Sequence, residues 1–152
     1  MNIIRICPDF FYKKENRYKG LSISLVNIIN ELKRLGVYTE IITLRSDITN
    51  VGGNKIYLLQ ERRPFSVIRT GIDSYKLLKK LNFDIIHTHQ YSFFFLYHYK
   101  SKFNVPLVHE IHGDPLSREK KISNFQKPNY RDELYNYHFN RYASKRANAV
   151  IV

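Results

Sequence analysis

Two short runs rich in β-branched residues, at 84–88 and 106–111, constrain the fold most strongly. Both are predicted to be strands, and the stretch between them is long enough to form a helix. Antiparallel strands can be joined by a short turn, whereas parallel strands need a crossover of a dozen or more residues. Residues 91–103 suit such a crossover, so the unit is predicted to be a right-handed strand-helix-strand. Ligands of open parallel sheets bind outside the carboxyl ends of the strands, and a histidine, His89 or His112, directly follows each run.

The same alternation continues along the chain and predicts an α/β fold. Strands are expected at 2–7, 37–44, 55–59, 84–88, 106–111 and 149–152, and helices near 21–35, 68–78, 91–103 and 135–143. Pro8 is expected to end the first strand, and Gly36 to cap the first helix. Together these elements predict a Rossmann-like, doubly wound parallel sheet in the order 3-2-1-4-5-6, with helices on both faces.

Composition bounds the answer further. At 152 residues the chain has the size of one domain, and 25 Lys and Arg against 13 Asp and Glu give a net charge of +12, which favours phosphate-bearing partners. The single Cys7 excludes a disulfide framework and is expected to be buried in the first strand. No segment approaches the roughly 20 apolar residues of a membrane span.

Four of the six histidines lie in the stretch at 84–115. His87 and His89 are two residues apart, so on a strand they share a face, as a metal-binding pair would. The other interpretation is that one packs within the strand while His89, nearer the carboxyl edge, contacts a ligand. No metal is expected, because no carboxylate cluster accompanies the pair in the sequence. His109 is expected in the core, and His98 and His138 on helices.

The loop at 8–20 mixes basic and aromatic residues. Its charges at Lys13, Lys14, Arg17 and Lys19 could hold an anionic ligand or lie on a phospholipid surface, with Phe10, Phe11 and Tyr12 at the interface. A solvated basic loop is the alternative. Gly20 would allow a phosphate or a sugar to approach the amino end of the first helix, unless it is only a glycine tolerated at a helix start.

Five segments in this order resemble the N-terminal domain of glycosyltransferase family 4, a retaining group with the two-domain GT-B architecture. They are Asn-Ile-Ile-Arg-Ile-Cys-Pro at 2–8, Asn-Glu-Leu-Lys-Arg-Leu-Gly-Val-Tyr-Thr-Glu-Ile-Ile-Thr-Leu at 30–44, Phe-Asp-Ile-Ile-His-Thr-His at 83–89, Val-Pro-Leu-Val-His-Glu-Ile-His-Gly-Asp at 105–114 and Arg-Ala-Asn-Ala-Val-Ile-Val at 146–152. The family often has two glycines in its first loop, where Lys19-Gly20 offers one.

The resemblance implies that residues 1–152 are a single acceptor-side domain, and that the C-terminal nucleotide-sugar domain, with its paired glutamates, is absent from this chain. The sequence ends within the last expected strand, which suggests that it is the N-terminal half of a longer protein. The family's cleft histidine matches His112, which would be catalytic, and its loop glycine, which faces the donor diphosphate, matches Gly20. Lys19, His89 and Gly113 would complete the substrate-binding residues.

By resemblance the activity is that of a hexosyltransferase in carbohydrate biosynthesis, which moves a sugar from a nucleotide sugar to a glycan, lipid-linked or small-molecule acceptor. The nucleotide sugar is a co-substrate bound mainly by a companion GT-B domain in cis or in trans, no other cofactor is implied, and the isolated half is expected to be inactive. A cytoplasmic location is expected, with peripheral contact at an anionic inner membrane face. Two other functions stay open: a non-catalytic basic module for anionic lipid or nucleic acid, although no specific nucleic-acid motif is present, and a His-x-His metal hydrolase.

Overall fold

The structure, a computed structural model, describes residues 1–10, 20–60, 66–89, 91–111 and 130–151. Its elements follow in the order β1 (Asn2–Phe10), α1 (Gly20–Arg34), β2 (Tyr38–Ser46), β3 (Asn50–Val51), β4 (Asn54–Leu58), α2 (Ser66–Leu78), β5 (Ile85–His89), η1 (Tyr91–Lys102), β6 (Leu107–Glu110), α3 (Tyr130–Ser144) and β7 (Ala149–Ile151).

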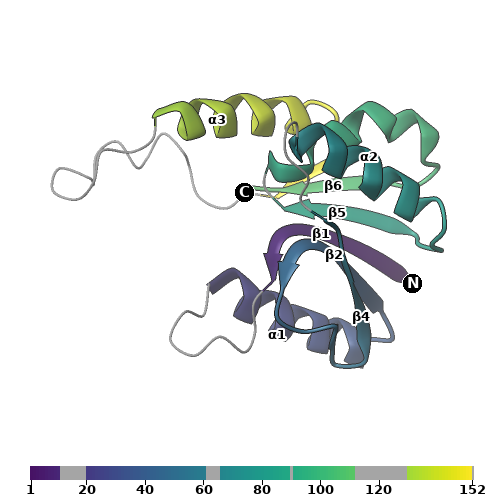
Figure 1. Cartoon of the computed structure of the whole chain (residues 1–152). Coiled ribbons are helices and arrows are strands. Elements are labelled where there is room, and N and C mark those ends of the chain that lie inside the picture. Colours follow the sequence, from purple (N-terminus) through teal and green to yellow (C-terminus); the bar gives the residue numbers. More distant parts are fainter. Residues whose placement is uncertain (11–19, 61–65, 90, 112–129, 152) are drawn as a thin grey trace, which may run out of the picture.

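One sheet runs through the molecule in the order β3-β4-β2-β1-β5-β6-β7 (Figure 1). Every pair of neighbours is parallel except β3 and β4. The predicted order 3-2-1-4-5-6 is confirmed, since the six expected strands correspond to β1, β2, β4, β5, β6 and β7. The sequence did not indicate β3, a two-residue strand that joins β4 through Gly52 and Gly53, both at positive φ, as a tight hairpin requires.

Helices cover both faces of the sheet and enclose two separate cores. In Figure 1, α1 lies on one side of the sheet, and α2 and α3 lie on the other. The core beneath α1 contains Cys7, Phe10, Leu25, Val26, Ile29, Ile41, Val51 and Ile56. The core on the opposite face contains Ile4, Ile6, Ile42, Leu78, Ile86, Leu96, Tyr97, Leu107 and Ala143. Cys7 is buried in the first strand, as expected. Phe10 is also buried, so it is not available to a membrane surface.

The first strand continues past the proline that was expected to end it. β1 pairs with β5 only over Ile3 to Ile6, but its pairing with β2 extends to Phe10. Beyond Ile6 the strand therefore has one neighbour in the sheet, and proline is tolerated where a backbone N–H has no ladder partner to reach. The Pro8 carbonyl accepts a hydrogen bond from Thr43 Oγ1 at 3.2 Å.

The end of α1 confirms the predicted glycine cap. Gly36 has a φ of 74°, its N–H donates to the Lys33 carbonyl at 3.0 Å, and the Val37 N–H donates to the Leu32 carbonyl at 2.9 Å. This pair of bonds is the Schellman motif, which satisfies carbonyls at the end of the helix.

The crossover at 91–102 is a 3-10 helix, η1, rather than the α-helix that a strand-helix-strand unit usually contains. Its residues are apolar nearly all round, so burial does not favour the 3.6-residue period over a three-residue one. Leu96 and Tyr97 are buried, and Tyr99 stacks on Tyr75 of α2 with ring centroids 4.2 Å apart. The segment thus packs against a helix of the same chain.

Candidate functional site

The carboxyl edge of the sheet is where the elements named by the sequence converge. β1 leads from this edge to α1, which begins at Gly20 and covers one face, while β5 leads to η1 on the other face. β1 and β5 are neighbours, so the connections diverge between them, which is the switch point at which open α/β sheets bind ligands. Figure 1 shows the amino end of α1 at the same edge as the arrowhead of β1.

Of the predicted site residues, the structure places Gly20 and His89. Gly20 is the first residue of α1, and His89 is the last residue of β5. Lys19, His112 and Gly113 lie outside the described residues, so the distance between His112 and Gly20 is not described. β6 ends at Glu110, two residues before His112, so the chain enters that segment from the carboxyl edge.

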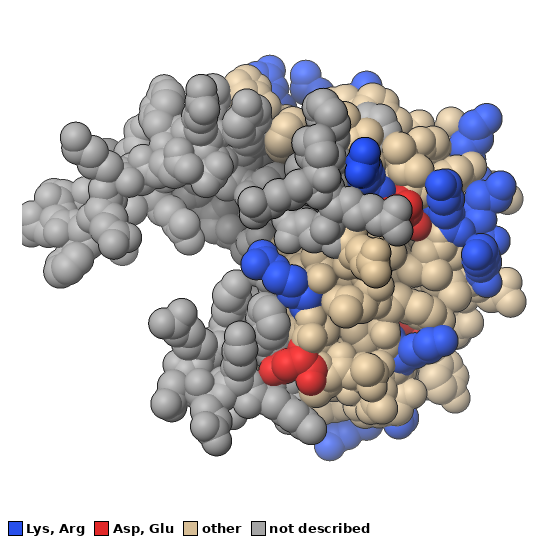
Figure 2. Space-filling view, viewed as in Figure 1, with Lys and Arg blue, Asp and Glu red and all other residues tan. Residues whose placement is uncertain are grey.

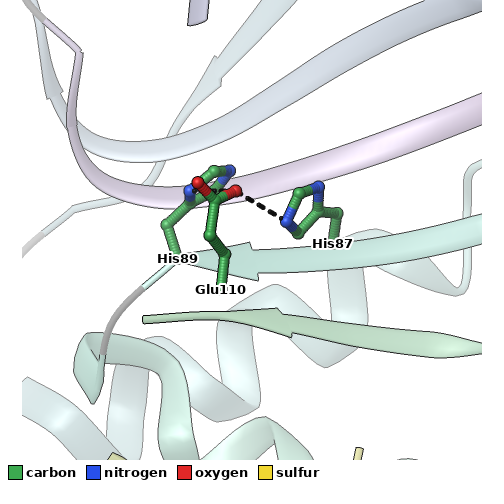
Figure 3. Close-up of side chains that lie close together, drawn as sticks. All are labelled: His87, His89 and Glu110. Carbon is green, nitrogen blue, oxygen red and sulfur yellow. Dashed lines mark ion pairs between the residues drawn. The ribbon is translucent and has the colours of Figure 1, made fainter. Parts of the chain in front are cut away.

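His89 is completely buried, with an exposed fraction of 0%, and Glu110 of β6 lies beside it. The His89 Nδ1 atom is 3.2 Å from Glu110 Oε2, and His87 Nε2 is 2.9 Å from the same oxygen. The two imidazole rings stack with centroids 4.5 Å apart, which confirms that both histidines share one face of β5. Figure 3 shows the carboxylate against the two rings.

Arg5 of β1 completes this group, which we call the Arg5–Glu110 cluster: Arg5, His87, His89 and Glu110. Arg5 Nη1 lies 3.4 Å from His89 Nε2, and Arg5 is itself buried. An arginine can only donate, so His89 Nε2 must accept, and the proton of the neutral ring is then on Nδ1, directed at Glu110. Hydrogen bonds are therefore donated in one direction through the cluster, from the guanidinium to the imidazole and from the imidazole to the carboxylate.

Burial lowers the pKa of the Arg5 guanidinium below its ordinary value, and the nearby charge of Glu110 opposes that shift. A buried cation is costly unless a counter-charge accompanies it, and the Glu110 carboxylate supplies one across two strands. Sequence reasoning missed Arg5 and Glu110 because their partners are 84 residues away or on another strand.

The donor atoms of His87, His89 and Glu110 lie within 4.8 Å of one another, which is close enough for a metal ion. Two imidazoles and a carboxylate suit Zn²⁺ or Fe²⁺. Arg5 opposes such a site in two ways. A metal on His89 Nδ1 would place the proton on Nε2, facing the Arg5 donor, and the ion would add two positive charges beside a buried guanidinium. The residues thus fit a hydrogen-bonded network better than a metal centre.

The third histidine of the stretch faces the opposite core, as predicted. His109 is buried, its Nδ1 atom is 3.0 Å from Thr88 Oγ1, and its Nε2 atom is 3.2 Å from Asn140 Oδ1 of α3. Thr88 is in turn hydrogen-bonded to the Tyr97 hydroxyl of η1. This chain of polar groups joins β5, β6, η1 and α3 beneath the sheet and leaves His109 no part in the carboxyl edge.

His98 and His138 lie on helices, as expected. His98 on η1 contacts the Tyr142 hydroxyl and lines a hollow of about 630 Å³ with Pro106, at the amino end of β6. His138 is exposed on α3.

Basic side chains are distributed rather than gathered on the face drawn in Figure 2, where lysines and arginines lie around the rim with uncharged residues between them. That distribution gives little support to a nucleic-acid surface among the described residues in this view. Within the parts of the chain that the structure describes, no helix has the length and apolar character needed to cross a membrane.

Comparison with known proteins adds the following. The model of the family described as Glycosyltransferase Family 4 matches residues 18–152. A sucrose-phosphate synthase from Thermosynechococcus elongatus aligns with 100% of the chain, at a TM-score of 0.71 and 14% identity. The catalytic domain of starch synthase IV from Arabidopsis thaliana, bound to ADP and acarbose, aligns with 73% of it, at a TM-score of 0.51 and 13% identity. The chain spans 42% and 34% of these two structures, and no curated protein matches by sequence.

Proposed function

Because the chain belongs to glycosyltransferase family 4 and has the fold of one half of a GT-B enzyme, we propose that it is the acceptor-side half of a retaining glycosyltransferase. The donor would be a nucleotide sugar held mainly by a companion domain, and the acceptor a glycan, a lipid-linked sugar or a small hydroxylated molecule. We expect the protein in the cytoplasm, where nucleotide sugars are available, with the basic loop at 11–19 against an anionic membrane face.

The observation that carries this proposal is the convergence at the carboxyl edge. α1 starts there at Gly20, and β6 delivers the chain there two residues before His112. The amino end of α1 offers N–H donors and a positive dipole to a diphosphate, and His112 would position or protonate a reacting group. Orientation of the two substrates and stabilisation of the leaving diphosphate would account for most of the rate enhancement, without an obligatory metal.

The test is sugar transfer by the protein as its gene encodes it, with the companion half added in trans if it is encoded separately. Transfer from a panel of radiolabelled nucleotide sugars to glycan and lipid-linked acceptors is measured, and the anomeric configuration of the product is read by NMR. We expect a product that retains the donor's configuration. Inversion, or the absence of transfer and of acceptor binding across the panel, would contradict the proposal.

Replacement of His112 tests its proposed catalytic role. His112→Ala should lower turnover by about a hundredfold or more, the range for a positioned general acid or base. The control is His98→Ala, because His98 is exposed and lies at the amino end of the sheet. Equal turnover in the two folded variants would show that His112 has no catalytic role.

A further inference from the structure

We propose that Glu110 is a positioning residue, which holds the carboxyl ends of β5 and β6 in a fixed relation beneath the acceptor site through the Arg5–Glu110 cluster. Its link to the acceptor rests on the function proposed above. The network itself does not, because it follows from the contacts of four side chains.

The location of the cluster is the first argument. Arg5 pairs with His87 across β1 and β5, and His89 pairs with Glu110 across β5 and β6, so all four side chains are on one side of the sheet. Three strands are thus joined by side chains near the edge at which β6 ends, two residues before His112. A small displacement of β6 against β5 would displace the point from which the chain leads to His112.

The energetics are the second argument. Glu110 is the counter-charge of a buried guanidinium, and its side chain retains an exposed fraction of 17%. Apolar residues of similar volume would often stabilise a core as well as a buried ion pair does. What a charged, hydrogen-bonded cluster adds is a single arrangement, because any other register of the strands leaves Arg5 without a partner. The cluster therefore suits positioning better than simple packing.

The two histidines are not equivalent in this network. His89 Nδ1 can donate to Glu110, whereas His87 Nε2 is close to the same oxygen but off the line of a hydrogen bond. The central path is thus Arg5 to His89 to Glu110, and His87 is a lateral neighbour. Glu110→Gln keeps the shape of the side chain and an acceptor oxygen but removes the charge, which makes it the informative substitution.

The kinetic test compares Glu110→Gln with Glu31→Gln, the same change at a glutamate on α1 that is 64% exposed. In the transferase assay we expect Glu110→Gln to lower kcat/KM for the acceptor by about ten- to a hundredfold, as misplacement of a bound group does. The KM for the nucleotide sugar should not change. Glu110→Asp, which keeps the charge on a shorter side chain, should recover part of the loss and serves also if the glutamine variant does not fold.

A merely structural role predicts a different result, namely a lower melting temperature and less active protein with both KM values unchanged. That result would overturn the inference, as would equal acceptor kinetics in Glu110→Gln and Glu31→Gln.

A second readout needs no activity. Long-range ¹H–¹⁵N spectra of the ¹⁵N-histidine-labelled protein should show His89 as the neutral Nδ1–H tautomer, unchanged by added Zn²⁺. An Nε2–H tautomer, or stoichiometric metal bound by His87 and His89, would overturn the network. If the tautomer is as expected but the wild-type protein transfers no sugar, the function proposed above fails and the network stands.

Discussion

At the scale of single residues, the histidines of β5 and β6 have different surroundings because a strand directs alternate side chains to opposite faces. His89 and Glu110 face the side of Arg5, whereas Thr88 and His109 face the core beneath α2, η1 and α3. Each histidine is buried, and each has a defined set of hydrogen-bonding partners. Protonation of His109 should therefore affect folding, which can be measured.

Protonation of His109 should destabilise the fold in mild acid. Burial lowers the pKa of His109 below its ordinary 6.5, against the opposing effect of the hydrogen bond to Asn140. The unfolded chain then binds a proton that the folded chain does not, so the free energy of unfolding is highest above pH 6.5 and falls as the pH drops through that value. The slope from this residue is at most about 1.4 kcal/mol per pH unit.

Urea unfolding at pH 7.5, 6.5 and 5.5 checks this. His109→Gln should lose part of the slope that the wild-type protein shows, even if it is less stable at every pH. His138→Gln, at an exposed position on α3, should keep the whole slope. If the two variants have the same slope, His109 is not the residue responsible.

At the scale of elements, sequence periodicity predicted the strands that build the parallel sheet and their order, because β-branched runs and helical stripes are local signals. The hairpin strand β3 was missed because two residues have no periodicity. The η1 segment was assigned to a helix, but its 3-10 geometry was not predicted, because a segment that is apolar nearly all round has no period that distinguishes the two helix types. The candidate site was only half predicted: His89 and Gly20 follow from their position in the motifs, whereas Arg5 and Glu110 become neighbours only when β1, β5 and β6 align.

The cap of α1 tests a local signal directly. Gly36→Ala should destabilise the protein by about 1–2 kcal/mol, because its φ of 74° is a left-handed conformation that a Cβ disfavours. No heavy atom lies within 4 Å of the Cβ position, so the cost comes from the backbone and not from a clash. Gly36→Asn should cost less, since asparagine tolerates this conformation. Thermal unfolding measures both, and an alanine variant as stable as the asparagine variant would contradict this account.

At the scale of the whole molecule, the two edge strands of the sheet, β3 and β7, differ in how well they are protected from pairing with another chain. On one side the hairpin of β3 and β4 closes the sheet, and on the other β7 is exposed at all of its residues. Val150 and Ile151 keep exposed fractions of 40% and 48%. Unpaired strand edges with apolar side chains are templates for pairing with another chain.

The 152-residue chain is therefore expected to self-associate at micromolar concentrations when it is expressed without a companion domain. Sedimentation velocity should show a concentration-dependent increase in mass, and Ile151→Lys should reduce it. The matched control is Leu35→Lys, because Leu35 is 78% exposed but lies at the end of α1, away from β7. A monodisperse wild-type monomer would contradict self-association through the β7 edge.

The central place of β1 has a consequence for biosynthesis. Its neighbour β2 leaves the ribosome early, and the core beneath α1 draws only on residues up to Ile56. The opposite face of the same strands, with Ile4, Ile6 and Ile42, has to wait for α3 and Ala143. At about 5–20 residues per second, the delay from Ile56 to Ala143 lasts about 4–17 s. During that interval the nascent chain exposes one apolar face of an incomplete sheet. Such a face is expected to bind a ribosome-associated chaperone.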